Sequence, residues 1–327
     1  MSGRSHGFGK VLAAASIATV AALSPLAATA QDGQVTIVAT TGMIADAARE
    51  IGGDRADVTA LMGPGIDPHA YRQTRSDIAA MTRADLVLWN GLYLEAQLEE
   101  FLLDLEGSVP VVAVAEEGVP VEARIGHDDY EGRFDPHVWM DPDLWSGVVA
   151  SVRDAMIAVD PEGAEAYAAN AAAYLEEVAA LADYARTVLE SVPEESRVLI
   201  SAHDAFNYFG AAYGFEVVGI QGISTESEAG LARIEELVSM LVERDIRAVF
   251  VESSVSDRNI RALIEGAAAQ GHTVSVGGEL FSDAMGEPGT YEGTWLGMID
   301  HNATVIARAL GGEAPERGRL GTLSAGM

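Results

Sequence analysis

Short apolar runs alternate with longer amphipathic stretches along almost the whole chain. The runs are rich in β-branched residues, which favours strands, and they lie at 35–40, 56–62, 85–89, 109–114, 197–202, 215–220, 246–251 and 273–276. The stretches between them place apolar residues at helical spacing. Strands that alternate with helices of this length are typical of parallel sheets with right-handed crossovers. The pattern therefore predicts an α/β fold.

The amphipathic stretches predict the helices and one long loop. Helices are expected at 43–51, 76–80, 92–105, from Asp141-Pro142 onward, from Asp204, at 228–244, after Ser256 and near 292–310. Asp141-Pro142 is a strong start signal, because aspartate caps a helix and proline fits its first position. Residues 115–136 are polar and are expected to form a loop.

One segment in the middle of the chain predicts an unusually long helix. From Pro161 to Ser191 alanine dominates, and apolar or aromatic residues recur near helical spacing at Tyr167, Tyr174, Val178, Leu181, Tyr184 and Val188. A continuous helix here would be about 45 Å long. We therefore predict two α/β lobes, each a parallel sheet flanked by helices, at residues 31–159 and 193–327. One long rigid linking helix at 160–192 would join them.

The first 30 residues have the pattern of a secretory signal peptide. Arg4 and Lys10 form a basic start, residues 11–26 are apolar, and Ala28-Thr29-Ala30 offers a cleavage site. The apolar run is short for a membrane span, and no later stretch reaches about 18 apolar residues. We predict that residues 1–30 are removed and that the mature protein resides in the periplasm. The sequence has no cysteine, so we expect no cysteine-linked lipid anchor, disulfide or thiolate ligand.

The chain is strongly acidic, with a formal net charge of −30. Such a surface repels nucleic acid and anionic lipid headgroups and weakly favours cations. The acidic residues are spread over the whole chain, so their distribution indicates solubility and does not locate a site.

The tripeptide Asp-Pro-His occurs twice, as Asp67-Pro68-His69 and Asp135-Pro136-His137. His203 directly follows a predicted strand, and Asp283 follows another after a short glycine-containing loop. Ligands of open α/β sheets bind beyond the carboxyl ends of the strands, where loops converge. Three imidazoles and one carboxylate suit a transition metal. The sequence therefore predicts one metal site between the lobes, formed by His69, His137, His203 and Asp283.

Several neighbouring residues are candidates for support of this site. Each proline stiffens its loop, and Asp67 and Asp135 are expected to accept hydrogen bonds that hold the loops in place. Glu252 ends a strand and is either such a supporting acid or a helix-capping or salt-bridging group. Trp139 and Trp145 are expected to pack in the core. The remaining histidines of the mature chain are interpreted as structural; they are His127, His272 and His301.

Four segments resemble the metal-binding solute-binding proteins of bacterial ABC importers, in particular the TroA-like zinc/manganese branch. They are 65–71 with the first Asp-Pro-His, 135–142 with the second, 201–209 with Ser-Ala-His-Asp, and 277–286 with Phe-Ser-Asp-Ala. The resemblance covers essentially the whole mature chain. It implies that the ligands are His69, His137, His203 and Asp283. It also implies that a rigid helix joins the lobes and that the protein docks onto a membrane permease powered by an ATPase.

Two differences from the specialised members of that family indicate its mixed zinc/manganese branch. The third ligand is histidine, where strict manganese or iron binders commonly have glutamate. The loop before the second ligand contains only His127, whereas high-affinity zinc members have a histidine-rich loop there.

Together these features predict a periplasmic, monomeric binding protein without enzymatic activity. It would capture one divalent transition metal, Zn²⁺ or Mn²⁺ with Fe²⁺ as a further candidate, and deliver it to an ABC importer. Two alternatives stay open. One is a zinc-dependent hydrolase in which the three histidines hold zinc and Asp283 acts as a base. The other is an adhesin or metal-buffering protein on the same scaffold. The physiological metal, the permease-docking residues and the extent of lobe closure are left undetermined by the sequence.

Overall fold

A computed structural model describes residues 33–126 and 132–324, together with Gly3. The predicted signal peptide, Gly3 apart, lies outside the described residues, and so do His127 and the acidic residues beside it. Among the described helices, none has the length and apolar character needed to cross a membrane.

The first lobe contains a parallel sheet of four strands in the order β2-β1-β3-β4. The strands are β1 (Val35–Ala39), β2 (Ala56–Ala60), β3 (Leu86–Trp89) and β4 (Val111–Ala113). Ile37 faces a core shared with the helices α1 (Gly42–Gly52) and α5 (Pro142–Val159), whereas its neighbour Val38 joins a cluster with Leu102. The alternation of side chains along a strand therefore gives β1 two buried faces.

Three shorter helices complete this lobe, namely α2 (Arg75–Met81), α3 (Glu99–Leu105) and α4 (Val114–Gly118). Short 3₁₀ turns lie at Gly53–Arg55, Val121–Ala123, Val138–Met140, Pro161–Gly163 and Glu194–Ser196. As predicted, Asp141 caps α5 by accepting a hydrogen bond from the backbone N–H of Asp143, and Pro142 occupies the first helical position.

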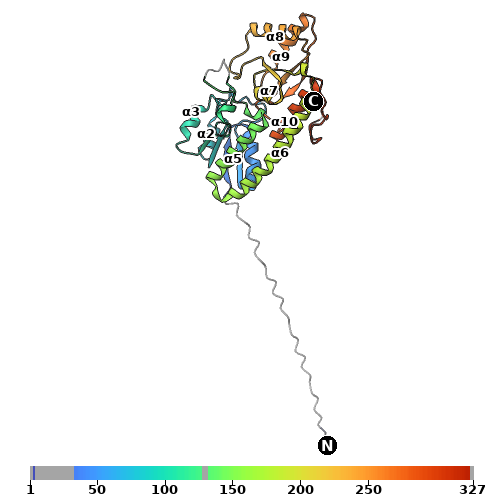
Figure 1. Ribbon diagram of the computed structural model, residues 1–327. Helices are drawn as coiled ribbons and strands as arrows, with labels where there is room; N and C mark the ends of the chain where they lie inside the picture. Colours follow the sequence, from blue (N-terminus) through green and yellow to red (C-terminus); the bar gives the residue numbers. More distant parts are fainter. Residues whose placement is uncertain (1–2, 4–32, 127–131, 325–327) are drawn as a thin grey trace. The chain divides into compact units, whose positions relative to one another are not determined.

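The second lobe contains two parallel strand pairs, β5 (Val198–Ser201) with β6 (Glu216–Gly219) and β7 (Ala248–Glu252) with β8 (Ser275–Leu280). Strand β5 lies beside β7. The helices are α7 (Asn207–Tyr213), α8 (Leu231–Glu243), α9 (Arg258–Ala269) and α10 (Trp295–Ala309). Helices α8 and α9 lie side by side and pack on one face of the strands (Figure 1). Helix α10 packs against β8.

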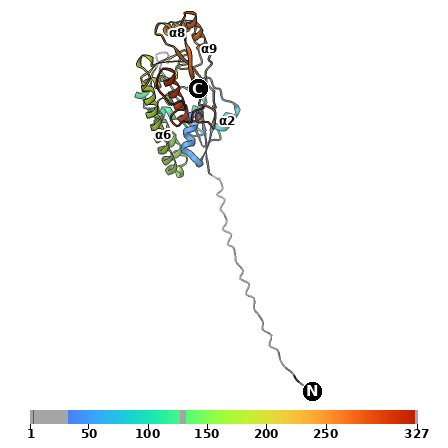
Figure 2. The same cartoon turned by 90° about the vertical axis from the view of Figure 1, so that its right-hand side faces the viewer.

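The predicted long helix is α6 (Ala164–Glu190), which has 27 residues and is about 40 Å long. It runs beside α5 and contacts α1 in the first lobe and α10 in the second (Figures 1 and 2). Its buried residues include Tyr167, Tyr174, Val178 and Leu181. The predicted α/β fold, with two lobes joined by one long helix, is confirmed.

The helix expected at 92–105 begins later than predicted. Residues 91–93 have φ angles of 78°, 54° and 67°, which place them in the left-handed region, so α3 starts only at Glu99. The buried carboxylate of Glu95 accepts hydrogen bonds from the backbone N–H groups of Asn90 and Gly91. These bonds hold a tight turn in place of the first helical turns.

Three other expectations need correction. The loop expected at 115–136 contains most of α4, and α7 begins at Asn207, three residues after the predicted start. Strand β8 extends through the two glycines at 277–278 to Leu280, so Asp283 follows the strand closely. A register shift interrupts the pairing of β7 with β8, and Gly278 approaches Val305 of α10 too closely to accommodate a side chain.

Candidate metal centre

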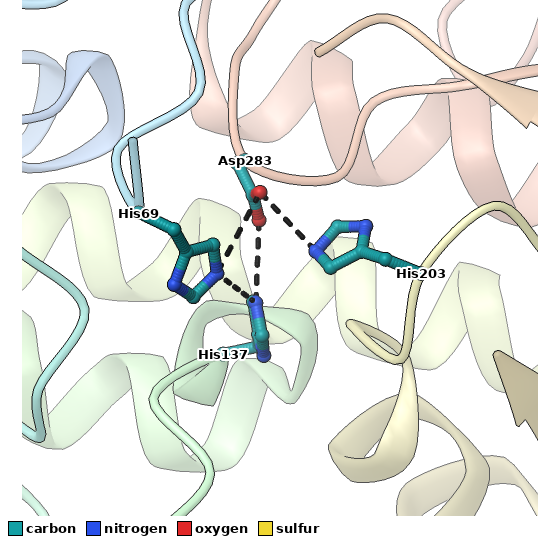
Figure 3. Close-up of side chains that lie close together, drawn as sticks. All are labelled: His69, His137, His203 and Asp283. Carbon is teal, nitrogen blue, oxygen red and sulfur yellow. Dashed lines mark hydrogen bonds and ion pairs between the residues drawn. The ribbon is translucent and has the colours of Figure 1, made fainter. Parts of the chain in front are cut away.

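The four predicted side chains meet at one buried point (Figure 3). Nε2 of His137 lies 3.3 Å from Nε2 of His69 and 3.3 Å from Oδ1 of Asp283. Oδ2 of Asp283 lies 3.2 Å from Nε2 of His203 and 3.9 Å from Nε2 of His69. Donors at about 2.0–2.1 Å from one ion at the corners of a tetrahedron are about 3.3–3.4 Å apart. Three of these four distances are close to that edge length, and the four donor groups lie within 4.8 Å of one another, close enough to contact one cation.

His69, His203 and Asp283 lie beyond strands, as the sequence predicted, but the prediction was wrong for His137, which does not directly follow a strand. His69 follows β2 and a turn in which Gly65 has a φ of 68°. His203 follows β5, and Asp283 follows β8. His137 immediately precedes the 3₁₀ turn Val138–Met140. All four side chains are almost inaccessible, with exposed fractions of 2% or less.

The carboxylate of Asp135 holds His137 in a fixed orientation. Its Oδ1 accepts hydrogen bonds from the backbone N–H of His137 at 2.9 Å and from the ring Nδ1 at 2.7 Å. Its Oδ2 accepts a hydrogen bond from Asn207 of the second lobe. A carboxylate on Nδ1 directs Nε2 toward the site and increases the basicity of the ring. The expected role of Asp135 is therefore confirmed.

Glu252 does the same for His203, which resolves the alternatives left open by the sequence. Its two carboxylate oxygens accept hydrogen bonds from the backbone N–H and the ring Nδ1 of His203. Both side chains are fully buried. Glu252 is thus a supporting acid, contributed by the end of the neighbouring strand β7.

The protonation of the metal-free cluster follows from burial and from these carboxylates. Burial lowers the pKa of His69 to about 3, so its ring is neutral. Burial also disfavours the charged form of His137, but Asp135 and Asp283 together raise its pKa to about 9. For His203, Glu252 and Asp283 likewise outweigh burial and raise the pKa. Burial would raise the pKa of Asp283, but the two imidazolium rings hold it well below its usual value. In the absence of a cation, two of the three histidine rings therefore carry a proton.

A second group of buried polar residues supports the His137 loop and was not predicted. The side-chain amide of Asn90 donates a hydrogen bond to the carbonyl oxygen of Pro136. Glu95 accepts hydrogen bonds from the Asn90 backbone and from the hydroxyl of Thr40 at the end of β1. The dipeptide Asn90-Gly91 directly after a buried strand is a turn signal that could have indicated this loop.

The remaining predicted residues have structural contacts. His272 and His301 each lie within hydrogen-bonding distance of a backbone carbonyl, those of Ile246 and Glu279. Trp145 is buried and stacks on Trp295 at 5.3 Å, in agreement with a role in the core.

Comparison with known proteins identifies the family. Residues 37–309 match the family described as the periplasmic component A of the zinc-uptake complex. The chain belongs to this family. Among its relatives are substrate-binding proteins of metal ABC transporters, such as SsaB of Streptococcus sanguinis, which is 28% identical over 86% of this chain.

Relatives with different metals in their names are similar over most of their length. The manganese-binding lipoprotein MntA of Bacillus subtilis is 47% identical over 85% of this chain and 90% of its own. The iron-binding protein YfeA of Yersinia pestis is 33% identical over 92% of this chain and 97% of its own. The solved structure of the periplasmic zinc-binding protein TroA of Treponema pallidum has a TM-score of 0.83 at 45% identity, covering 85% of this chain and 99% of TroA. Family membership therefore leaves the metal open. The sequence of 327 residues contains no cysteine.

Proposed function

We propose that this protein captures one divalent transition metal in the periplasm and delivers it to the permease of an ABC importer, with His69, His137, His203 and Asp283 as ligands. The proposal rests on the geometry of four buried donor groups that lie within 4.8 Å of one another, close enough to contact one cation. Family membership supports the transport role.

The donor set favours Zn²⁺ in equilibrium binding and also allows Mn²⁺. Three imidazoles and a carboxylate suit zinc, and the Irving–Williams order places zinc above manganese and iron at such a site. Manganese prefers more oxygen ligands. Asp283 can supply both of its oxygens, because Oδ1 faces His137 while Oδ2 faces His203 and His69. The metal that cells import therefore depends on supply and on the permease as well as on affinity.

Binding rather than catalysis agrees with the number of donors. A catalytic zinc usually has three protein ligands and an open position for water. Here Asp283 lies beside the histidine rings and would supply a fourth donor, and Asp135 and Glu252 are already hydrogen-bonded to histidine rings. The protein would act as a monomer that presents its loaded form to the permease.

A chelator-competition titration on purified protein, with and without His137→Ala, tests the binding step. Wild type should bind one Zn²⁺ tightly, whereas the variant should lose tight binding and remain folded. His272→Ala removes an imidazole that contacts the Ile246 carbonyl instead, and it should bind like wild type. Tight binding in His137→Ala would refute the assignment of the site.

Uptake of radioactive zinc and manganese by cells of the source organism that lack the gene tests the delivery step. Wild-type protein should restore uptake of one of these metals, and His137→Ala should not. Uptake that does not depend on the gene would exclude the transport role even if the purified protein binds metal.

A further inference from the structure

The two Asp-Pro-His loops have the same sequence but use their aspartates differently. Asp135 binds both the backbone and the ring of His137. Oδ1 of Asp67 accepts a hydrogen bond from the backbone N–H of His69 at 2.9 Å, but among the described residues no group is hydrogen-bonded to Nδ1 of His69. The His69 ring is therefore the only imidazole of the described site whose orientation is not fixed by a carboxylate.

The other oxygen of Asp67 contacts the second lobe. Oδ2 accepts a hydrogen bond of 2.5 Å from the hydroxyl of Thr225, a residue 158 positions away in the sequence. Thr225 lies in the connection between β6 and α8. The position of the His69 backbone is thus coupled, through a single aspartate, to a hydroxyl in the second lobe.

Both partners of this contact are partly exposed. Asp67 and Thr225 line an open cavity of about 180 Å³, together with residues such as Ser254, whereas the ligand side chains are buried. The ring orientations of His137 and His203 are fixed by Asp135 and Glu252. A departing cation would therefore separate first from His69, the ligand with the least support.

We propose that His69 is the first ligand to dissociate when the cation is released, and that Thr225, acting through Asp67, sets the rate of that step. Thr225 is a positioning residue, because its hydrogen bond reaches His69 through Asp67. The inference rests on the proposed function, since it requires that the four side chains hold the cation.

The test measures release of Zn²⁺ to an excess of chelator by stopped flow, in wild type and in Thr225→Val. Loss of a hydrogen bond to a charged group should accelerate release roughly tenfold. The absorption spectrum of the Co²⁺-loaded variant should match wild type, because the four ligands are unchanged. Thr225→Ser retains the hydroxyl and should restore slow release.

A second contact between the lobes supplies the matched control. The side-chain amide of Gln97 donates a hydrogen bond of 2.6 Å to Glu226, the residue that follows Thr225. Gln97→Ala should alter the release rate less than twofold, because general contact between the lobes is not the controlling element. Equal acceleration in Gln97→Ala and Thr225→Val would overturn the proposal. A release rate equal to that of wild type in Thr225→Val, or a changed Co²⁺ spectrum in that variant, would also overturn the proposal.

Single histidine-to-alanine variants test the order of release. His69→Ala should weaken zinc affinity the least of the three histidines, because its ring has the least support. A loss in His69→Ala equal to that in His137→Ala would contradict the order. Failure of the proposed function would look different, since wild-type protein itself would then fail to bind zinc tightly.

Discussion

The indole N–H of Trp139 donates a 2.8 Å hydrogen bond to the backbone carbonyl of Ser282, and this bond joins two ligand loops from different lobes. Trp139 lies two residues after His137, and Ser282 lies one residue before Asp283. The carbonyl of Trp139 in turn accepts a hydrogen bond from the indole of Trp295. Trp139, expected from the sequence to serve only in packing, therefore also holds the His137 and Asp283 loops together.

Trp139→Phe should keep most of the packing and remove this bond. Leaving a buried carbonyl without its donor costs about 1–3 kcal/mol, so the free energy of unfolding should fall by that amount in urea titrations of the metal-free protein. Zinc affinity should fall about tenfold, because the two loops lose their direct link. Unchanged affinity would show that the loops are positioned independently. Trp145→Phe, a change within the stacked pair of Trp145 and Trp295, should lower stability but leave affinity near wild type.

Asp135→Asn should weaken zinc binding by about 10–100-fold, the usual effect of losing a carboxylate that supports a metal-bound histidine. The neutral amide can still accept the backbone hydrogen bond of His137, so the loop should keep its conformation. Competition titration gives the affinity, and circular dichroism checks the fold. An affinity equal to that of wild type would mean that the charge of Asp135 does not influence the ligand.

The sequence predicted which four candidate ligands lie together, but it did not predict all the residues and turns that hold them in place. Runs of β-branched residues marked the strands, and ligands beyond strand ends converge in this type of fold, so His69, His137, His203 and Asp283 could be grouped without coordinates. Asn90-Gly91 signals a turn, but the left-handed conformation of Leu92 and Tyr93 could not be predicted. It depends on Glu95 and on a hydrogen bond from the Leu92 backbone to Glu116, whereas the local pattern favours a helix.

The different support of His69 and His137 was also beyond prediction. Their tripeptides are identical, and only the tertiary structure places Thr225 against one aspartate and Asn207 against the other.

Metal binding should release protons at neutral pH. The pKa values of His137, raised to about 9, and of His203, also raised, mean that both rings are protonated at pH 7 in the metal-free protein. Ligation requires neutral imidazole. Calorimetry in buffers of different ionisation enthalpy should therefore detect about two protons released per zinc at pH 7. Zinc affinity should increase as the pH rises toward 9. Binding without proton release would contradict these protonation states.

The metal-free protein should show the opposite dependence of stability on pH. The folded-state pKa of His137 is raised from 6.5 to about 9, so its contribution to stability is full below pH 6.5 and is lost as the pH rises through 9. The unfolding free energy of metal-free protein should therefore decrease over this range, as measured by denaturant titration. The zinc-loaded protein should lack this decrease, because its imidazoles are already neutral.

A buried acid far from the ligands gives an independent test of the fold. Asp46 of α1 accepts a hydrogen bond from the backbone N–H of Trp295 at the start of α10. Burial outweighs this bond and raises the pKa of Asp46 to about 6, so ionisation costs stability as the pH rises from 4 to 6. Asp46→Asn keeps the acceptor without the charge. It should be more stable than wild type at pH 7, by as much as about 3 kcal/mol, and equal or less stable at pH 4. A variant that is less stable at both pH values would contradict this account.

X-ray absorption spectroscopy of the zinc-loaded protein would show whether four residues distant in sequence hold one cation. We expect one zinc per chain with three imidazole nitrogens at about 2.0–2.1 Å and oxygen from one carboxylate, and one imidazole fewer in any zinc retained by His69→Ala. A zinc shell with fewer than three imidazoles in the wild-type protein, or one unchanged in His69→Ala, would contradict that expectation.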